Sequence, residues 1–359
     1  MDMIKLAYNE DKGREFIDLL KHTDPLFLLA ISYTETSEID GITIAGAVKE
    51  LIKYTPPADA EFIHYGYCRC IDTIPVTPDG KPTPALLTRA ALKAADIPML
   101  VVDAGSKVKP NMPYISIDAI PSKNIENEDA LDRKIVDKIY NNSIELGRTI
   151  SKLREFVIIG ESIPGGTTTA LAVLLSMGID AKFKVSSSMP ENPHDLKIRV
   201  VDNAMKRVDV TIGALRDKPL DAVAKLGDAM MITVAGIAIG LSKKSKVMLA
   251  GGTQMAAVLS LIKSLDYSAL PNISIGTTRY IIDDKNSNLI DLIKEIYDVP
   301  IITIDPMLDR SSKDGLKAYA NGFVKEGAGA GGASIAASLR IDNLLDIIER
   351  EYDICISHS

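Results

Sequence analysis

Glycine and threonine residues in the middle of the chain are suited to hold a phosphate group. An aliphatic run at 156–160 leads to glycines at 165 and 166, and threonines follow where a helix is expected to begin. Glycines let backbone N–H groups approach an oxyanion, and a helix N-terminus adds the positive end of its dipole. The segment is not a P-loop, because no lysine follows the glycines. It is not a nucleophile elbow either, because Pro164 replaces the second glycine. The pattern predicts a phosphate site, with a threonine-capped strand-to-helix turn as the alternative.

A carboxylate beside a second glycine-rich segment is a candidate proton acceptor. Glu326 precedes Gly327, Gly329 and Gly332, which form a G-x-G-x-x-G pattern that follows no clear strand. Backbone that closely approaches a ligand would place this carboxylate next to it, and partial desolvation would raise its pKa toward neutrality. A flexible glycine hinge with a solvated Glu326 explains the segment equally well.

A third glycine-rich turn, at Gly251 and Gly252, again joins an aliphatic run to a helical segment. Ligand contact and close helix–strand packing explain these small residues equally well. If all three turns lie along one edge of a sheet, a phosphorylated or ribosylated ligand across that edge is expected.

The elements that must position these residues are indicated by short aliphatic runs that do not alternate with polar residues. Such runs are typical of parallel strands covered by helices on both faces. We expect strands at 26–31, 99–103, 156–160, 208–212, 246–250, 273–276 and 301–305. The expected fold class is α/β, with a parallel sheet flanked by helices in a Rossmann-like three-layer arrangement.

Helical spacing of apolar residues predicts further elements and the domain organisation. Helices are expected near 15–21, 46–54, 131–153 and 341–348, and loops at Pro56-Pro57 and 71–83. The nearly apolar segment 229–241 is shorter than the roughly 20 residues that span a bilayer, so it predicts a buried helix. We expect an α/β catalytic domain over 23–335 and a small helical subdomain built from 1–22 and 336–359.

Composition and charge exclude several classes of protein. The hydrophobic fraction of 46% is that of a globular chain. The formal net charge of −7 argues against a nucleic-acid partner, which a basic surface would bind. The three cysteines and four histidines lack the spacing of metal ligands, so no metal site is expected. The N-terminus does not look like a secretion signal, so we expect a cytoplasmic protein that does not associate with membranes.

The order of these motifs resembles the nicotinate-nucleotide:dimethylbenzimidazole phosphoribosyltransferases, and most closely their archaeal branch. The family's G-E-M-G-I-G-N-T-T pattern is matched in the segment 160–168, with Gly166 in place of the asparagine. Its D-x-x-x-x-x-G…A-A-M-A-G pattern is matched between 221 and 236, and its L-G-E-G-T-G-A pattern is echoed at 326–330. A fainter match joins 84–88 to the family's Y-P-x-E-V-T stretch.

The resemblance implies transfer of 5-phosphoribose from nicotinate mononucleotide to a benzimidazole-type nitrogen, giving nicotinate and an α-ribazole-type phosphate in cobamide lower-ligand assembly. It implies Glu326 as the general base, Glu161 as a second catalytic carboxylate and no cofactor. Lys197 matches a family lysine, although a surface-helix position explains it equally well. The implied substrate-binding residues are Gly165, Gly166, Thr167, Thr168, Lys197, Gly251, Gly252, Gly327, Gly329 and Thr88. The resemblance also implies a homodimer.

Departures from the family pattern leave the acceptor base open. The family's D-H-G-V segment has no convincing counterpart here, and its Asp-Gly pair has become Gly251-Gly252. Adenine, a hydroxybenzimidazole and a phenolic acceptor all remain compatible with the sequence. Two other classes of function also remain open. A nicotinamide-cofactor dehydrogenase would use 327–332 as its pyrophosphate turn after a strand, and a non-catalytic nucleotide sensor would bind without turnover.

Overall fold

The computed structural model describes residues 3–46, 48–75 and 81–356. Its strands form one eight-stranded sheet within these residues, in the order β1-β8-β7-β6-β5-β2-β3-β4. All neighbouring strands are parallel except β1, which runs antiparallel to β8. The strands are β1 (Ile4–Tyr8), β2 (Leu26–Ile31), β3 (Met99–Asp103), β4 (Ile115–Ser116), β5 (Phe156–Ser162), β6 (Lys246–Ala250), β7 (Ile273–Thr278) and β8 (Ile301–Ile304).

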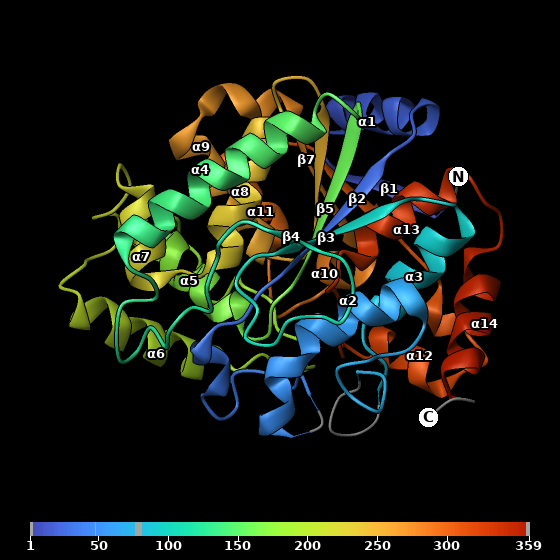
Figure 1. Ribbon diagram of the computed structural model, residues 1–359, viewed down its shortest axis with the longest axis horizontal. Coiled ribbons are helices and arrows are strands. Elements are labelled where there is room, and N and C mark those ends of the chain that lie inside the picture. Colours follow the sequence, from blue (N-terminus) through green and yellow to red (C-terminus); the bar gives the residue numbers. More distant parts are fainter. Residues whose placement is uncertain (1–2, 47, 76–80, 357–359) are drawn as a thin grey trace.

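Helices cover both faces of this sheet (Figure 1). One face carries α4 (Arg133–Ile150), α5 (Gly166–Ser176), α6 (His194–Arg207), α7 (Pro219–Leu226), α8 (Ala229–Leu241), α9 (Gln254–Leu265) and α11 (Leu289–Ile296). The other carries α1 (Glu10–His22), α2 (Thr55–Tyr65), α3 (Ala85–Ala94), α12 (Asp314–Ala320), α13 (Ala330–Ser338) and α14 (Leu344–Ile356). The short helix α10 (Arg279–Ile282) follows β7, and 3₁₀ helices lie at Glu35–Glu38, Lys49–Tyr54, Tyr267–Asn272 and Leu308–Arg310. The expected α/β three-layer architecture is confirmed.

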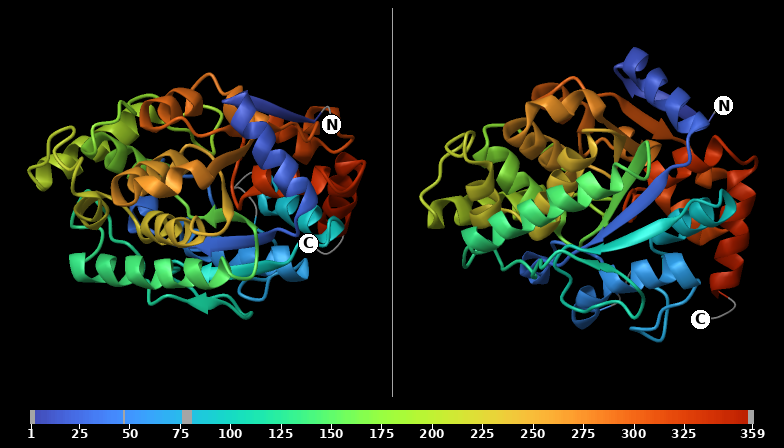
Figure 2. Two further views of the ribbon diagram at one scale, coloured as in Figure 1. Left: turned by 90° about the horizontal axis from the view of Figure 1, so that it is seen from above. Right: turned by 45° about the horizontal axis from the view of Figure 1, so that its top comes forward.

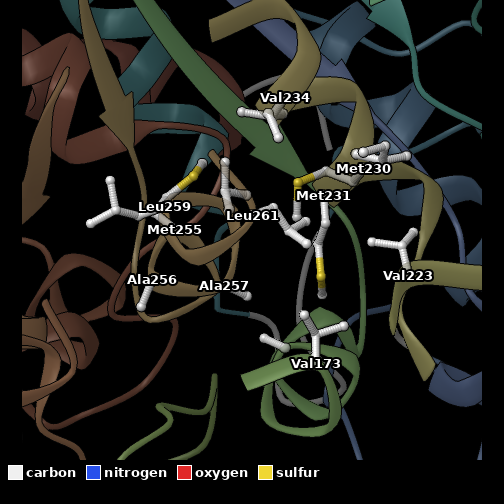
Figure 3. Close-up of a cluster of buried hydrophobic side chains, with 14 of the residues drawn as sticks. Val173, Val223, Met230, Met231, Val234, Met255, Ala256, Ala257, Leu259 and Leu261 are labelled. Carbon is white, nitrogen blue, oxygen red and sulfur yellow. The ribbon is translucent and has the colours of Figure 1, made fainter. Parts of the chain in front are cut away.

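Two hydrophobic cores, one on each face, follow from the alternation of side chains along the strands. Leu28 and Ile159 face the core on the α4–α9 side, whereas Phe27 and Ile158 face the core on the α13 side. Both faces of these strands are buried, which is why their sequences are continuously apolar. Figure 3 shows side chains of α5, α7, α8 and α9 meeting in the first core. Every residue of α8 is buried, as the sequence indicated.

Six of the seven expected strands are present, and the exception has a local cause. Residues 208–212 follow the end of α6 without forming a strand, and Asp209 has a left-handed backbone with φ of 53°. Ile212 is 60% exposed, so this aliphatic run does not enter the core. The strand prediction for this segment is wrong.

Other local predictions meet with mixed outcomes. The helices expected at 15–21, 131–153 and 341–348 correspond to α1, α4 and α14. The helix expected near 46–54 is a 3₁₀ helix at Lys49–Tyr54. Pro56 and Pro57 do not form a loop but lie in the first turn of α2, where a missing backbone N–H costs nothing. Part of the expected loop at 71–83 lies outside the described residues, at 76–80.

The two chain ends lie on the same side of the molecule, in Figure 1 and in both views of Figure 2. The segment 1–22 contributes β1 to the main sheet as well as α1, and the strand was not anticipated. Phe16 of α1 and Ile348 of α14 pack into the same core as Phe156 of β5. The division into a catalytic domain and a helical subdomain stays a prediction.

Candidate active site

The chain reverses its direction across the sheet between β2 and β5, and this places a cavity at the carboxyl ends of these strands. From β2 the chain moves outward to β3 and β4, then returns to β5 and proceeds through β6 and β7 to β8. Such a switch point leaves a crevice in which α/β proteins bind ligands. A cavity with about 990 Å³ of empty space, including the part open to solvent, is found there. It has a size suited to a nucleotide.

Residues from distant parts of the chain line this cavity. The segment after β2 contributes 42–46, the end of β5 and the turn after it contribute 161–167, and the turn after β6 contributes 252–254. Ser186, Ser187 and Ser188 line it from the segment before α6, and Glu326 and Gly327 from the segment before α13. The structure thus brings the three glycine-rich turns to one edge of the sheet.

The turn after β5 has the geometry expected of an anion site. Gly165 precedes α5 with a left-handed backbone at φ of 74°, and a Cβ atom there would lie 2.9 Å from the Cα of Ser37. No side chain caps α5, so its first backbone N–H groups are not taken up by a cap. Gly166 and Thr167 line the cavity at this point. The N-terminus of α9 reaches the same cavity at Thr253 and Gln254.

The carboxylate of Glu326 is held by four hydrogen-bond donors. The backbone N–H groups of Gly331 and Gly327 donate to Oε1 at 3.0 and 3.3 Å. The backbone N–H of Thr278 and the hydroxyl of Thr277 donate to Oε2 at 2.8 and 3.3 Å. Burial raises the pKa of Glu326 to about 7, and the backbone hydrogen bonds oppose this rise. A carboxylate with a pKa near neutrality is suited to accept a proton.

The backbone around Glu326 is unusual. Val324, Gly327, Ala328 and Gly329 all have positive φ angles, of 41°, 153°, 50° and 69°. A β-branched residue at positive φ is an outlier, and such strain persists only where surrounding contacts enforce it. Lys325 supplies one such contact, because its Nζ lies 3.0 Å from a carboxylate oxygen of Asp284 in a buried ion pair.

Glu161 lies at the end of β5 and is 5% exposed. Burial raises its pKa well above the ordinary value, and the charges of Glu326 and Asp228 raise it further. The backbone N–H of Ala328 donates to the carbonyl of Glu161 at 2.8 Å, which ties the two carboxylate-bearing segments together. The two acids named from the sequence are therefore neighbours in one cavity.

The remaining residues named from the sequence lie in two groups. Gly165, Gly166, Thr167, Gly252 and Gly327 line the cavity, whereas Thr168, Lys197, Gly251, Gly329 and Thr88 do not. The residues of the second group lie outside the lining of the cavity.

Four of the five residues of the second group have an identifiable structural contact. The hydroxyl of Thr88 donates to the carbonyl of Ala328 at 2.8 Å. A Cβ atom at Gly251 would come within 3.7 Å of a carboxylate oxygen of Glu161, and one at Gly329 would collide with Phe27. Thr168 is fully buried in the first turns of α5, and its hydroxyl has no hydrogen-bond partner among the described residues.

Lys197 is fully buried, so the surface-helix interpretation of this residue is wrong. Its Nζ donates to the carbonyl of Ser186 at 2.6 Å. Burial and the charge of Lys325 lower its pKa to about 7. Lys197 therefore fixes the serine segment 186–188 that lines the cavity.

Several lining residues were not anticipated from the sequence. Asp59 of α2 accepts hydrogen bonds from the hydroxyls of Thr83 and Ser162. The Oε1 atom of Gln254 is buried without a hydrogen-bond partner among the described residues. Asp59 belongs to no motif, so the sequence carried no signal for it beyond its polarity, whereas Gln254 lies two residues after the third glycine-rich turn.

Three further observations concern other classes of function and of site. The glycine pattern at 327–332 follows α12 and an irregular segment, so it lacks the preceding strand that a dinucleotide-binding turn requires. Within the described residues, no cluster of His, Cys, Asp or Glu could hold a metal ion. None of the helices in this part of the chain is long and apolar enough to span a membrane.

Comparison with known proteins identifies the family of the chain. A family model described as "Phosphoribosyltransferase" matches residues 88–276, which is more than half of the chain. The chain is 47% identical over 326 residues to a UPF0284 protein of Sulfurisphaera tokodaii, covering 90% of both chains. It is 46% identical over 331 residues to a UPF0284 protein of Archaeoglobus fulgidus, covering 91% of this chain and 93% of that one.

A solved structure shares the fold at much lower identity. The nicotinate-nucleotide–dimethylbenzimidazole phosphoribosyltransferase of Thermus thermophilus superposes with a TM-score of 0.62 and 14% identity, over 98% of this chain and 95% of that chain. The extent of the family-model match, together with the cavity at the β2/β5 switch point, shows that this chain belongs to the phosphoribosyltransferase family.

Proposed function

We propose that this protein transfers 5-phosphoribose from nicotinate mononucleotide to a nitrogen of a benzimidazole-type or purine base. The observation that carries this proposal is that Glu326 and Glu161 share one cavity with the uncapped N-terminus of α5. An anion site and a proton acceptor at the two sides of one cavity are the parts that such a transfer needs.

The phosphate would bind at the turn formed by Gly165, Gly166 and Thr167. Backbone N–H groups at the start of α5 would donate to its oxygens, and the helix dipole would favour its negative charge. The serine hydroxyls at 186–188 line the same cavity and could donate to the phosphate or the ribose. Lys197 would act here as a positioning residue, through the carbonyl of Ser186.

The reaction exchanges one carbon–nitrogen bond for another at the anomeric carbon of the ribose. A ring nitrogen of the acceptor attacks this carbon, and the bond to the nicotinate nitrogen breaks with its electron pair passing to the leaving pyridine. Glu326 takes the proton of the acceptor's ring N–H. The positively charged pyridinium is already a good leaving group, so orientation of the acceptor and removal of its proton are the main tasks of the protein.

The four present donors occupy the acceptor positions of the Glu326 carboxylate, so one of these hydrogen bonds must break before Glu326 can accept the proton of the base. The 3.3 Å contact from the Thr277 hydroxyl is among the two longest, and a hydroxyl can rotate to another partner. The backbone donors at 2.8 and 3.0 Å would keep the carboxylate in place. Glu161, held beside it, would be the second carboxylate of the site.

The proposal is tested by incubating the protein with nicotinate mononucleotide and a panel of benzimidazoles and adenine. We expect release of nicotinate that depends on the acceptor. Chromatography then identifies the riboside phosphate that is formed. Binding of the mononucleotide by calorimetry without nicotinate release from any acceptor would instead indicate a non-catalytic nucleotide sensor. The proposed homodimer is tested by light scattering, with a mass of twice 38.8 kDa expected.

A further inference from the structure

Asp59 is a buried carboxylate on the wall of the cavity, and the reaction proposed above gives it no task. It lies on α2 and is 4% exposed. The Thr83 hydroxyl donates to Oδ1 at 2.8 Å, and the Ser162 hydroxyl donates to Oδ2 at 2.7 Å. No lysine, arginine or histidine among the described residues forms an ion pair with it.

An unpaired buried carboxylate is costly unless a donor compensates it. Burial raises the pKa of Asp59 to about 6, so at neutral pH most of the population still carries the charge. Each carboxylate oxygen can accept two hydrogen bonds, and one hydroxyl on each leaves room for a further donor. The cavity that Asp59 lines is where such a donor could come from.

The contacts of Asp59 place it in the part of the cavity that suits a flat apolar ring. Thr83, its hydrogen-bond partner, donates its backbone N–H to the carbonyl of Pro75 at 3.1 Å. Pro84, the next residue, lies 3.2 Å from the Cβ position of Gly327. Pro75 and Pro84 both line the cavity, as do Ile42 and Val324.

The phosphate-binding elements form a separate group. A Cβ atom at Gly166 would lie 2.9 Å from the side-chain oxygen of Gln254. Thr253, the residue before Gln254, is hydrogen-bonded to Ser186. Asp59 has no hydrogen bond to Gly166, Thr253, Gln254 or Ser186. It is joined to the end of β5 through Ser162, three residues before Gly165, and Pro84, next to its partner Thr83, reaches the glycine directly after Glu326.

The charges of Asp59 and Glu326 also affect the pKa values of the same two neighbours. The charges of both raise the pKa of Glu161, and both raise the pKa of Tyr319. Both carboxylates line the same cavity, and Pro84 lies between the partner of Asp59 and the glycine after Glu326, so a single heterocycle against Pro84 could meet each of them.

We propose that Asp59 accepts a hydrogen bond from the acceptor base at a point remote from its attacking nitrogen, so that the preferred acceptor carries a hydroxyl or amino group on its six-membered ring. This inference rests on the proposed function for the identity of the occupant. Glu326 takes the ring N–H of the base, and Asp59 takes the second donor. An acceptor with methyl groups there leaves the carboxylate unpaired, and a site with an unpaired buried polar group discriminates strongly against such a ligand.

The experiment compares the affinities of four bases by calorimetry: benzimidazole, 5,6-dimethylbenzimidazole, 5-hydroxybenzimidazole and adenine. With the wild-type protein we expect the hydroxylated base, adenine or both to bind at least about tenfold more tightly than the two bases without a second donor. Equal affinities for all four bases would overturn the proposal, and this comparison needs no variant.

Asp59→Asn should remove this preference while leaving the affinity for benzimidazole itself within about threefold of wild type. The matched control is Asp228→Asn, because Asp228 is equally buried with a pKa of about 6 but does not line the cavity. The control should keep the preference. Equal weakening of all four bases by Asp59→Asn, or weaker binding of nicotinate mononucleotide alone, would contradict the role given to Asp59. Thermal unfolding of each variant checks that it is folded.

Failure of this inference and failure of the proposed function give different results. A binding preference that depends on Asp59, without nicotinate release from any acceptor, would sustain the inference and reject the transfer reaction. Nicotinate release with equal affinities for all bases would do the reverse.

Discussion

Glu326 is held by backbone donors from two elements, and this arrangement has both a structural and a chemical interpretation. Gly331 is in the first turn of α13, so the carboxylate caps this helix, and Thr278 lies at the end of β7. Helix capping alone would favour an ionised carboxylate with a low pKa. Burial prevails instead, and the raised pKa of about 7 distinguishes a proton acceptor from a simple cap.

The first prediction concerns the pH dependence of the transfer reaction. A general base works in its deprotonated form, so kcat/KM should rise with pH up to about 7 and level off above it. Glu326→Gln should lower kcat/KM by at least about a hundredfold and abolish this rise. Steady-state rates of nicotinate release between pH 5 and 9 provide the measurement.

A control variant separates the two roles of such a carboxylate. Glu61 is also fully buried and accepts hydrogen bonds from the backbone N–H groups of Cys70 and Asn111, but it does not line the cavity. Glu61→Gln should lower the unfolding temperature without changing the pH profile. If Glu326→Gln kept the wild-type profile, its carboxylate would be a structural cap only.

At the scale of elements, the glycine-rich turns serve close packing as well as binding. Gly329 precedes α13 with φ of 69°, and a Cβ atom there would lie 2.7 Å from the ring of Phe27 and 2.8 Å from the Cα of Gly160. Because Gly329 has no side chain, the loop that carries Glu326 packs closely against β5. The packing interpretation that the sequence offered for Gly251 and Gly252 thus applies to Gly329 as well, whereas Gly327 lines the cavity.

Gly329→Ala should therefore destabilise the fold by about 3 kcal/mol, from the left-handed backbone and from overpacking. Gly213→Ala is the matched control, because Gly213 has a similar φ of 79° but its nearest contact is 3.6 Å away. The control should cost only about 1 kcal/mol. Urea unfolding of both variants gives the comparison, and equal losses would show that packing against Phe27 contributes nothing.

The serine segment before α6 depends on one buried lysine. Lys197→Met removes the donor to the carbonyl of Ser186, so the KM for nicotinate mononucleotide should rise about tenfold while kcat changes less. Because the variant also removes a buried charge, the unfolding temperature need not fall. Lys206→Met, on the exposed side of the same helix, is the control and should leave KM unchanged. A loss of kcat alone would contradict a positioning role.

The sequence predicted the central strands well because their burial on both faces leaves a local signal. The edges gave no such signal. Residues of β1 are only partly buried, and β4 has two residues, so both strands exist through pairing with distant segments. The run at 208–212 has the composition of a strand, but no neighbouring strand pairs with it.

The same distinction holds for the site. Glu161 was found because it lies in a short motif after a recognisable aliphatic run, and Glu326 because it directly precedes a glycine-rich segment. Asp59 has no such context, and only the folding of α2 over the end of β5 brings it to Ser162. Residues that tertiary structure alone brings together cannot be identified from local sequence.

Across the whole molecule, the cavity collects several carboxylates whose pKa values burial raises. Besides Glu326 and Glu161, Asp59 lines the cavity, and Asp228 caps α8 nearby with a pKa of about 6. The two buried lysines near the site do not relieve this charge, because Lys197 is directed to the carbonyl of Ser186 and Lys325 is paired with Asp284. The fold thus maintains a site with excess negative charge at the cost of stability at neutral pH.

This cost predicts the direction in which stability changes with pH. An acid whose pKa is higher in the folded than in the unfolded state stabilises the fold below its unfolded pKa, and this stability is lost as pH rises through the folded pKa. The free energy of unfolding should therefore fall between about pH 4 and pH 7. For Asp228, with a folded pKa of about 6, the loss is up to about 3 kcal/mol. Asp228→Asn keeps a side chain that can cap α8, so it should flatten this part of the pH curve by that amount without unfolding the helix.

Urea unfolding at intervals from pH 4 to 8 measures the slope. Glu349→Gln is the control, because hydrogen bonds from Ser311 and Ser312 lower the pKa of this partly buried acid, and its effect should therefore be confined to lower pH. A wild-type stability that rises steadily from pH 4 to 7 would show that the buried carboxylates do not retain their protons in the folded state.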